Sequence, residues 1–436
     1  MKKILLTAGI VILSATVAFG ASTIEDGSLV ENSGIVEGTD NLASGSESEA
    51  NVGTIKLIES TVTNSGQVLN QADVYDSQNT ASGDHSEANL GSVRLENSTV
   101  SDSTVSNLGG IQSGHRNIAE GEESEANMGS INLENTTVQD GSDVTNQATM
   151  EPDSWNRALG DGSEANLGSI KMIESTVSES DVLNDVTTDS ISDNTASGTE
   201  SEANSASIRI HTTDVNNNSY ILNQADLHGA PNEASGDNSE ANMGAIRLKN
   251  STVDNSLIQN SVAVSHSSNL ASGDRSQAST GSIKISSGSE VRDSDVSNFG
   301  TVISNSTNTA SGYNSSANTG SMQISVSEIS NSTVWNTADI DNTDNTASGD
   351  NAEARVGSVR IKYSEINDAY VDNWVNVSDS TNTAEGDNST ARMATIEIDN
   401  SEVSGSDVLN YTSVSSSSNV ASGDDSEANL SSVVVK

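Results

Sequence analysis

Residues 232–248 read Asn-Glu-Ala-Ser-Gly-Asp-Asn-Ser-Glu-Ala-Asn-Met-Gly-Ala-Ile-Arg-Leu. This block occurs eleven times, with its leading Asn at intervals of 37 to 39 residues from residue 41 to residue 419. Four positions never vary among the copies: the leading Asn, an Ala two residues later, a Gly four residues later and an Ala nine residues later. A fixed period of this length is typical of solenoids and other repeat arrays.

A second half follows each block and also keeps one Asn in every copy. A shift of 19 residues places Asn51 of the first block on Asn70 of the following half, and Gly53 on Ala72. Asn, small and β-branched residues alternate with a period of two, as in strands with one inward face. The pattern predicts an all-β, elongated β-solenoid of about 19-residue coils, two coils per 37–39-residue repeat. About 22 coils would make a stack roughly 105 Å long at ~4.8 Å per coil.

The composition alone is typical of disorder, because apolar residues make up 32%, aromatic residues 3% and the formal net charge is −44. Periodicity changes this interpretation. Identical Asn side chains that stack from coil to coil can form amide ladders in a narrow core, where a buried amide needs a partner. The ladder residues predicted in this way are Asn41, Asn79 and Asn117 from the first half, and Asn70, Asn107 and Asn146 from the second.

The first twenty residues have the pattern of a secretory signal peptide. Lys2 and Lys3 precede an apolar run from residue 4 to 13, and small residues follow it. Cleavage after Gly20 would place Ala18 at the −3 position. The apolar run is too short for a comfortable membrane anchor. We therefore predict a signal peptide over 1–20, a secreted β-solenoid over 21–436, and no membrane insertion.

The charge and the lack of cysteine exclude several functions. An acidic chain is repelled by phosphate backbones, so we expect no nucleic-acid partner. Without Cys there are no disulfides, thiolate metal sites or thiol nucleophiles. The loops are regular, so we predict no enzymatic activity, no catalytic residues and no bound cofactor. Trp335 and Trp374 adjoin the second-half Asn and are predicted to face outward or stack, with carbohydrate contact as an alternative.

Acidic residues recur in a Gly-Asp-x-Ser-Glu segment. Carboxylates aligned along one edge could hold Ca²⁺, which prefers oxygen ligands. The alternative is a solvated acidic edge, and no copy matches a known calcium-binding repeat or loop. We expect weak, diffuse Ca²⁺ binding and no specific metal site. The candidate residues are Asp84, Glu87, Asp237, Glu240, Asp424 and Glu427.

The two ends of the predicted mature chain fit each other in sequence. Residues 431–436 joined to residues 21–24 lie in register with residues 91–100 inside the array. Open coil ends expose strand edges that can pair with another copy. We predict that the C-terminal coil of one molecule docks on the N-terminal coil of the next, with Ser22 and Ile24 at one assembly end and Val433 and Val435 at the other. The alternative is that duplication preserved whole units and the ends fray.

The repeat at 232–246 resembles the Asn/Ala/Gly/Gln-rich repeats of secreted functional amyloids, most nearly the Fap-type fibre subunits and more loosely the curli-type ones. The resemblance implies stacked β-coils that form extracellular fibres of a biofilm matrix. It favours a fibre, matrix or sheath subunit that polymerises with itself, with an exporter or nucleator as further partners. The alternative is a non-polymerising surface adhesin or ligand-binding solenoid with a role in cell adhesion.

Overall fold

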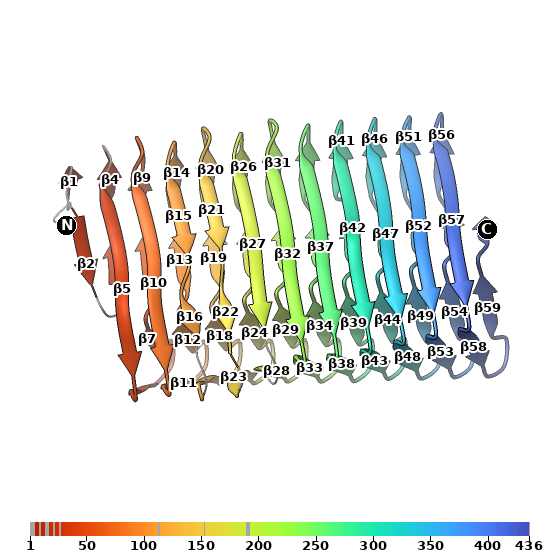
Figure 1. The fold of residues 1–436 in the computed structure, drawn as a ribbon, viewed down its shortest axis with the longest axis horizontal. Coiled ribbons are helices and arrows are strands. Elements are labelled where there is room, and N and C mark those ends of the chain that lie inside the picture. Colours follow the sequence, from red (N-terminus) through yellow and green to blue (C-terminus); the bar gives the residue numbers. More distant parts are fainter. Residues whose placement is uncertain are drawn as a thin grey trace.

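The chain winds into a stack of parallel coils (Figure 1). A coil has five strands, except that in two coils the sheet B strand is divided into two, β15 (Thr104–Asn107) with β16 (Gly110–Ile111) and β21 (Asp143–Asn146) with β22 (Thr149–Met150). The computed structural model describes residues 5–7, 10–13, 17–20, 22–25, 28–111, 114–151, 153–188 and 192–435. Every regular element in these residues is a β-strand. A coil near the middle consists of β31 (Asp214–Asn216), β32 (Tyr220–His228), β33 (Pro231–Ser235), β34 (Glu240–Met243) and β35 (Ile246–Lys249).

Equivalent strands of successive coils pair in parallel and form five long sheets. In the order in which a coil visits them, we name these sheets A, B, D, E and C. The first complete coil contributes β4 (Thr23–Glu25), β5 (Leu29–Glu37), β6 (Asp40–Ser44), β7 (Glu49–Val52) and β8 (Ile55–Ile58). The last contributes β56 (Glu402–Ser404), β57 (Asp407–Ser415), β58 (Ser418–Ser422), β59 (Glu427–Leu430) and β60 (Val433–Val435).

The β-solenoid class is confirmed, but the coil is twice as long as the sequence pattern predicted. Asn70 lies in register with Asn32 and Asn107, and Asn79 lies in register with Asn41. One turn therefore takes about 38 residues, and the chain makes about 11 turns. The two halves of the repeat look alike in sequence because both contain strands with an inward Asn and small residues. The strands of the two halves nevertheless belong to different sheets of the same coil. Eleven coils at ~4.8 Å give a stack of roughly 50 Å.

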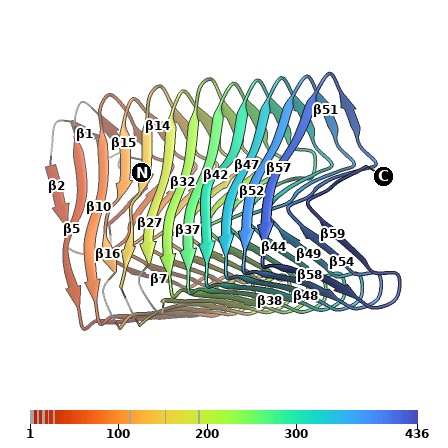
Figure 2. The ribbon, with the colours of Figure 1, turned by 45° about the vertical axis from the view of Figure 1, so that its right-hand side comes forward.

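Three buried clusters run the length of the stack. Sheets A, B and C enclose the widest one, with residues such as Val68, Leu95 and Val100. A second joins the end of sheet B to sheet E, as Val74 and Leu90 do. The third consists of Ala only and lies between sheets D and E. The two invariant Ala positions fall in this cluster, where the small side chain lets two sheets pack as a thin arm along the lower edge of the stack (Figure 2).

The invariant Gly turns the chain from sheet D to sheet E. Gly236 has φ +120°, and a Cβ there would lie 2.0 Å from the carbonyl oxygen of Gly198 in the preceding coil. Only Gly allows both this backbone conformation and such close stacking of turns. Gly45 of the first block has φ 126°, and its equivalents in the later coils, such as Gly83 and Gly423, also have positive φ.

Three short strands from the predicted signal peptide extend the N-terminal end of the stack. They are β1 (Leu5–Thr7), β2 (Ile10–Leu13) and β3 (Val17–Gly20), which pair with β4, β5 and β8. The rest of that predicted peptide, residues 1–4, 8–9 and 14–16, lies outside the described residues, as does Ala21 after the predicted cleavage site. Among the described residues, no helix has the length and apolar character needed to cross a membrane.

Candidate assembly interface

A ladder of buried amides runs along sheet B with a single direction. Asn32 Nδ2 donates to Asn70 Oδ1 at 3.0 Å, and Asn70 Nδ2 donates to Asn107 Oδ1 at 2.8 Å. Asn107 continues the row by donating to Asn146 at 2.9 Å. The same step repeats through every later coil to Asn410. Each amide thus presents its oxygen toward the N-terminal end of the stack and its NH₂ group toward the C-terminal end.

The leading Asn of each block forms a second ladder in sheet D. Asn41 Nδ2 donates to Asn79 Oδ1 at 3.0 Å, and Asn79 Nδ2 donates to Asn117 Oδ1 at 2.9 Å. Asn79 Nδ2 also donates to the backbone carbonyl oxygens of Ala50 and Asn89 in sheet E. The ladder therefore joins coils to each other and closes the arm of sheets D and E.

Removal of one rung should destabilise the stack. Asn223→Ala leaves the donor of Asn184 and the acceptor of Asn260 buried without their ladder partner. Because each buried unsatisfied group costs about 1–3 kcal/mol, we expect the free energy of unfolding to fall by at least about 2 kcal/mol. Urea unfolding followed by circular dichroism measures it. Asn376→Ala, at an exposed position of sheet B, is the matched control and should change stability little; equal losses would contradict the account.

The sheet B ladder has an incomplete rung at its N-terminal end. The side chain of Asn32 is fully buried, and its Oδ1 atom has no hydrogen-bond partner among the described residues. Strand register places Leu13 of β2 opposite Asn32, and Leu has no side-chain donor. The coil end is thus covered by backbone pairing while its amide acceptor stays unsatisfied.

The C-terminal end is open in the described residues. Strands β56 to β60 are each the last of their sheet, so one edge of each has no paired strand. Asn373 Nδ2 donates both to Gly357 O and to Asn410 Oδ1, whereas Asn410 Nδ2 donates only to Ala394 O, at 3.1 Å. The last coil therefore presents an amide donor without a following rung.

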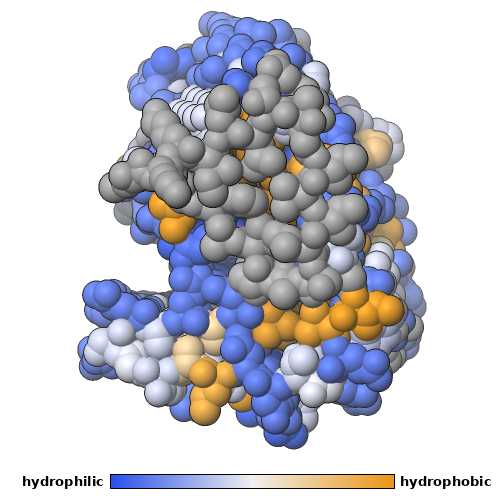
Figure 3. Space-filling model, turned by 90° about the vertical axis from the view of Figure 1, so that its left-hand side faces the viewer, coloured by the Kyte–Doolittle hydropathy of each residue, from blue (hydrophilic) through white to orange (hydrophobic). Residues whose placement is uncertain are grey.

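Apolar side chains are exposed at both ends. Val433 and Val435, predicted as assembly residues, are 52% and 72% exposed on β60. Ile35 and Leu42 are exposed on the first coil, and orange apolar surface reaches the lower half of the N-terminal end in Figure 3. Ser22 and Ile24, the assembly residues predicted at the N-terminal end, are buried, and Ile24 is flanked by strand β1 on one side and β9 (Thr61–Val62) on the other.

A row of ion pairs, which we call the charge ladder, lies in the corner between sheets E and C. Its acidic residues are Glu49, Glu87, Glu125, Glu164, Glu202, Glu240 and Glu353, and its basic residues are Lys56, Arg94, Lys171, Arg209, Arg247, Lys284 and Arg360. Lys171 Nζ lies 2.6 Å from Glu164 in its own coil and 3.2 Å from Glu125 in the preceding coil. Lys171, Arg209, Arg247 and Lys284 thus each tie their coil to the one before it.

At Glu164 and Glu240 the ion pairs hold a buried carboxylate in the charged form. Burial by itself raises the pKa of Glu164, but Lys171 and Arg209 outweigh it and lower the pKa to about 2. The pKa of Glu240 is likewise about 2, where Arg247 and Lys284 outweigh burial. Sequence reasoning missed the charge ladder, although a signal was present: Lys or Arg often follows the Glu of the block by seven residues, as Lys56 follows Glu49.

Acid should weaken the charge ladder. The folded-state pKa of Glu164 and Glu240 is below the ordinary value of about 4.3, so their contribution is full above about pH 4.3 and is lost as the pH falls toward 2. We expect the free energy of unfolding to drop across this window, as measured by urea unfolding at pH 7, 4.5 and 2.5. The double variant Glu164→Gln/Glu240→Gln should show a shallower drop; an unchanged drop would contradict the assignment.

The structure separates the carboxylates predicted to bind Ca²⁺. Asp84 and Asp237 accept hydrogen bonds from the turn of the next coil, and the backbone N–H of Asp424 donates to Asp387. Glu87 and Glu240 pair instead with bases of the charge ladder, and Glu427 accepts from Asn429. Within the described part of the chain, no group of three or more His, Asp or Glu residues has the arrangement of a metal site.

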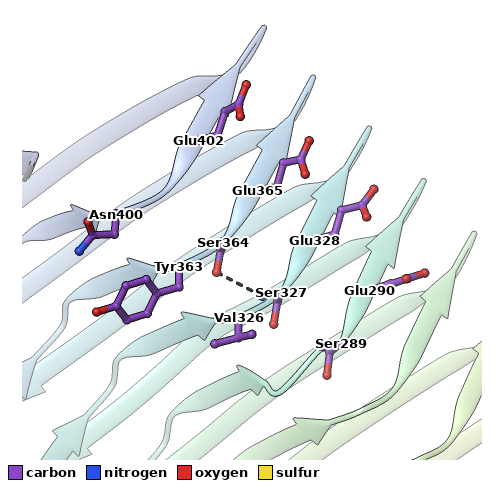
Figure 4. A pocket seen from close by; sticks show the side chains of 11 residues that line it. Ser289, Glu290, Val326, Ser327, Glu328, Tyr363, Ser364, Glu365, Asn400 and Glu402 are labelled. Atoms are coloured by element: carbon purple, nitrogen blue, oxygen red, sulfur yellow. Dashed lines mark hydrogen bonds between the residues drawn. The ribbon is translucent and has the colours of Figure 1, made fainter.

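A different acidic row lines the outer edge of sheet A. Glu290, Glu328, Glu365 and Glu402 lie in strand register, one per coil, beside a hollow of about 560 Å³ (Figure 4). Their carboxylates project from the same side, and Arg292 contacts only the first of them within salt-bridge distance. Like charges one coil apart repel, and dissolved cations reduce that repulsion.

No protein-family model matches this chain, and no curated protein matches it.

Proposed function

We propose that this chain is the structural subunit of a secreted fibre, matrix or sheath, and that its copies join head to tail by stacking coils. The observation that carries the proposal is the incomplete amide ladder of sheet B. Among the residues that the structure describes, Asn32 Oδ1 is a buried acceptor without a donor, and Asn410 Nδ2 ends the row as a donor without a following rung. A second copy in the same orientation supplies what each end lacks.

The charge ladder supports the same joint. Lys171 and Arg209 each contact a Glu of the preceding coil, at 3.2 and 3.1 Å. If the pattern continues between copies, Lys56 of one copy meets Glu427 of the copy before it. Such a contact joins two different surfaces, and a contact of this kind that does not close a ring produces a filament.

The proposal places the fibre outside the cell, after export has removed residues 1–20, as a component of a biofilm-type matrix of functional-amyloid character. It assigns no catalysis and no cofactor to the chain. The partners are further copies, with an exporter or nucleator to start growth. In the alternative, a surface adhesin with the same fold stays as single stacks.

Salt should accelerate assembly. The chain carries a formal net charge of −44, and the Glu row on sheet A repels itself along the stack axis. Screening by salt or divalent cations lowers the repulsion between subunits. We expect chains that begin at residue 21 to form filaments of uniform width faster in 150 mM NaCl or millimolar Ca²⁺ than in chelator at low salt.

Light scattering gives the rate, and negative-stain microscopy gives the form of the product. Mild acid, near pH 4.5, should also speed growth because exposed carboxylates begin to lose charge while Glu164 and Glu240 keep theirs. Equal rates of filament growth in chelator and in millimolar Ca²⁺ would contradict the prediction that screening of the negative charge speeds assembly. Dispersed rods under all conditions would contradict the fibre and favour the adhesin.

A further inference from the structure

A group of exposed aromatic rings lies on the outward face of sheet B. Its strands are β42 (Asp295–Ser304), β47 (Thr333–Asp341), β52 (Tyr370–Ser378) and β57, which lie side by side in Figure 1. The rings are those of Phe299, Trp335, Tyr370, Trp374 and Tyr411, which we call the aromatic strip. The chain has only eleven Phe, Trp and Tyr residues in all, so nearly half of them occupy four strands of one sheet face.

The rings of the strip are available to a ligand. Phe299, Tyr370, Trp374 and Tyr411 are between 45% and 56% exposed. Phe299 packs edge-on against Trp335 with ring centroids 5.4 Å apart, and Trp374 lies 5.7 Å from Tyr411. Exposure of several apolar rings to water is unfavourable, and a contiguous group of exposed rings is typical of a binding surface.

Carboxylates are the only charged groups among these rings. The outward positions of the four strands hold five Asp and no Lys, Arg or His: Asp295, Asp339, Asp341, Asp372 and Asp407. In strand register Trp335 lies beside Asp372, and Tyr370 lies beside Asp407. Burial, and then the charge of Asp407, raise the pKa of Asp372, as expected of carboxylates that lack a cation.

One end of the strip is hollowed. A hollow of about 300 Å³ lies beside Phe299 and Trp335, and Leu257, Gln259 and Asp295 also line it. It combines two aromatic walls with one carboxylate and one amide. Rings with adjacent carboxylates attract cations through both the ring face and the charge.

We propose that the aromatic strip binds a polysaccharide that carries free amino groups, that is, a polymer of hexosamine units. The apolar faces of the sugar rings stack on the aromatic side chains, and the ammonium groups meet the Asp carboxylates. The axial step of ~4.8 Å per coil is close to the length of one sugar unit, so a chain laid along the stack meets side chains at each step. This inference does not depend on polymerisation.

The position of the strip disfavours a basic peptide. It lies on the face of sheet B, where β42, β47 and β52 are paired with neighbouring strands on both sides and β57 alone of the four has an open edge. A peptide main chain would find few hydrogen-bond partners there, whereas peptides that bind sheets add at an edge. A sugar chain needs only the side chains that this face offers.

The test measures binding of a β-1,4-linked glucosamine hexamer to the full-length chain by calorimetry at low and physiological salt. We expect saturable binding that Trp374→Ala or Tyr411→Ala weakens about tenfold, as loss of one stacked, cation-binding ring predicts. Asp372→Asn should weaken it as well. Tyr363→Ala is the matched control, because Tyr363 is 56% exposed but lies outside sheet B, and it should leave binding unchanged.

Two further probes separate the sources of affinity. The fully N-acetylated hexamer, which has sugar rings but no charge, should bind at least about tenfold more weakly. Hexalysine, which has charge but no sugar ring to stack, should lose less affinity on Trp374→Ala than the glucosamine hexamer does. Equal binding of the two sugar hexamers would overturn the cationic part of the proposal. The whole proposal would be overturned if the glucosamine hexamer did not bind, or if neither Trp374→Ala nor Tyr411→Ala weakened its binding.

Discussion

The full-length chain is expected to remain as single stacks under conditions in which a chain that starts at residue 21 forms filaments. In the full chain, β1, β2 and β3 pair with β4, β5 and β8 and so cover the N-terminal edges of sheets A, B and C. Leu13 then lies opposite Asn32, where the account places the Asn410 amide of another copy. Removal of residues 1–20 frees three strand edges and one buried acceptor together.

At equal protein concentration, negative-stain microscopy should show filaments for the chain that starts at residue 21 and none for the full-length chain. The matched control replaces residues 2–20 with a flexible Gly/Ser segment of the same length, which should permit growth because it does not pair. If this control stays dispersed, chain length rather than strand pairing blocks assembly. Equal filament growth by the full-length chain and by the chain from residue 21 would contradict the proposal that β1, β2 and β3 block the N-terminal strand edges.

Glu397→Gln should cause the largest loss of stability of any single substitution considered. Glu397 is 2% exposed and accepts from Arg392 Nη2 at 2.5 Å, while Arg360 Nε lies 3.4 Å away. Arg355, in the preceding coil, is fully buried as well. Burial lowers the pKa of Arg392, and the charge of Glu397 opposes that shift. Loss of the carboxylate leaves the buried guanidinium of Arg392 without its ion-pair partner, which costs about 3–5 kcal/mol.

Urea unfolding of the full-length chain measures this loss. The exposed Glu402→Gln, in the next coil, should change stability by less than about 0.5 kcal/mol. The double variant Arg392→Met/Glu397→Met removes both charges and should recover much of the stability, because a buried pair is often replaceable by apolar residues. A loss for Glu397→Gln no larger than that for Glu402→Gln would contradict the role of the pair.

The sequence was sufficient to predict the fold class and the residue types that line the core. The invariant Asn, Ala and Gly have the roles that their chemistry suggests: stacked amides, a thin Ala-lined arm and a left-handed turn. The coil length was wrong because alternation with period two does not identify the sheet to which a strand belongs. Asn51 and Asn70 look equivalent in sequence, yet one lies in sheet E and the other in sheet B.

The interfaces were harder to predict for a similar reason. Glu49 and Lys56 lie on different strands, and only the turn at Gly53 brings them together, so the acidic segments resembled a solvated edge. The aromatic strip has no motif because its rings occupy different positions in successive coils. Trp335 precedes its ladder Asn and Trp374 follows its own, and only strand register places them on one face.

Cryo-electron microscopy of filaments grown from the chain that starts at residue 21 would resolve the joint between successive copies. The account predicts a single continuous solenoid with a strand spacing of ~4.8 Å along the axis and a subunit repeat of roughly 50 Å. Density at each joint should place the Asn410 amide against Asn32 and Lys56 against Glu427. Filaments in which stacks pack side by side, or in which the spacing is interrupted at every subunit end, would contradict head-to-tail coil stacking.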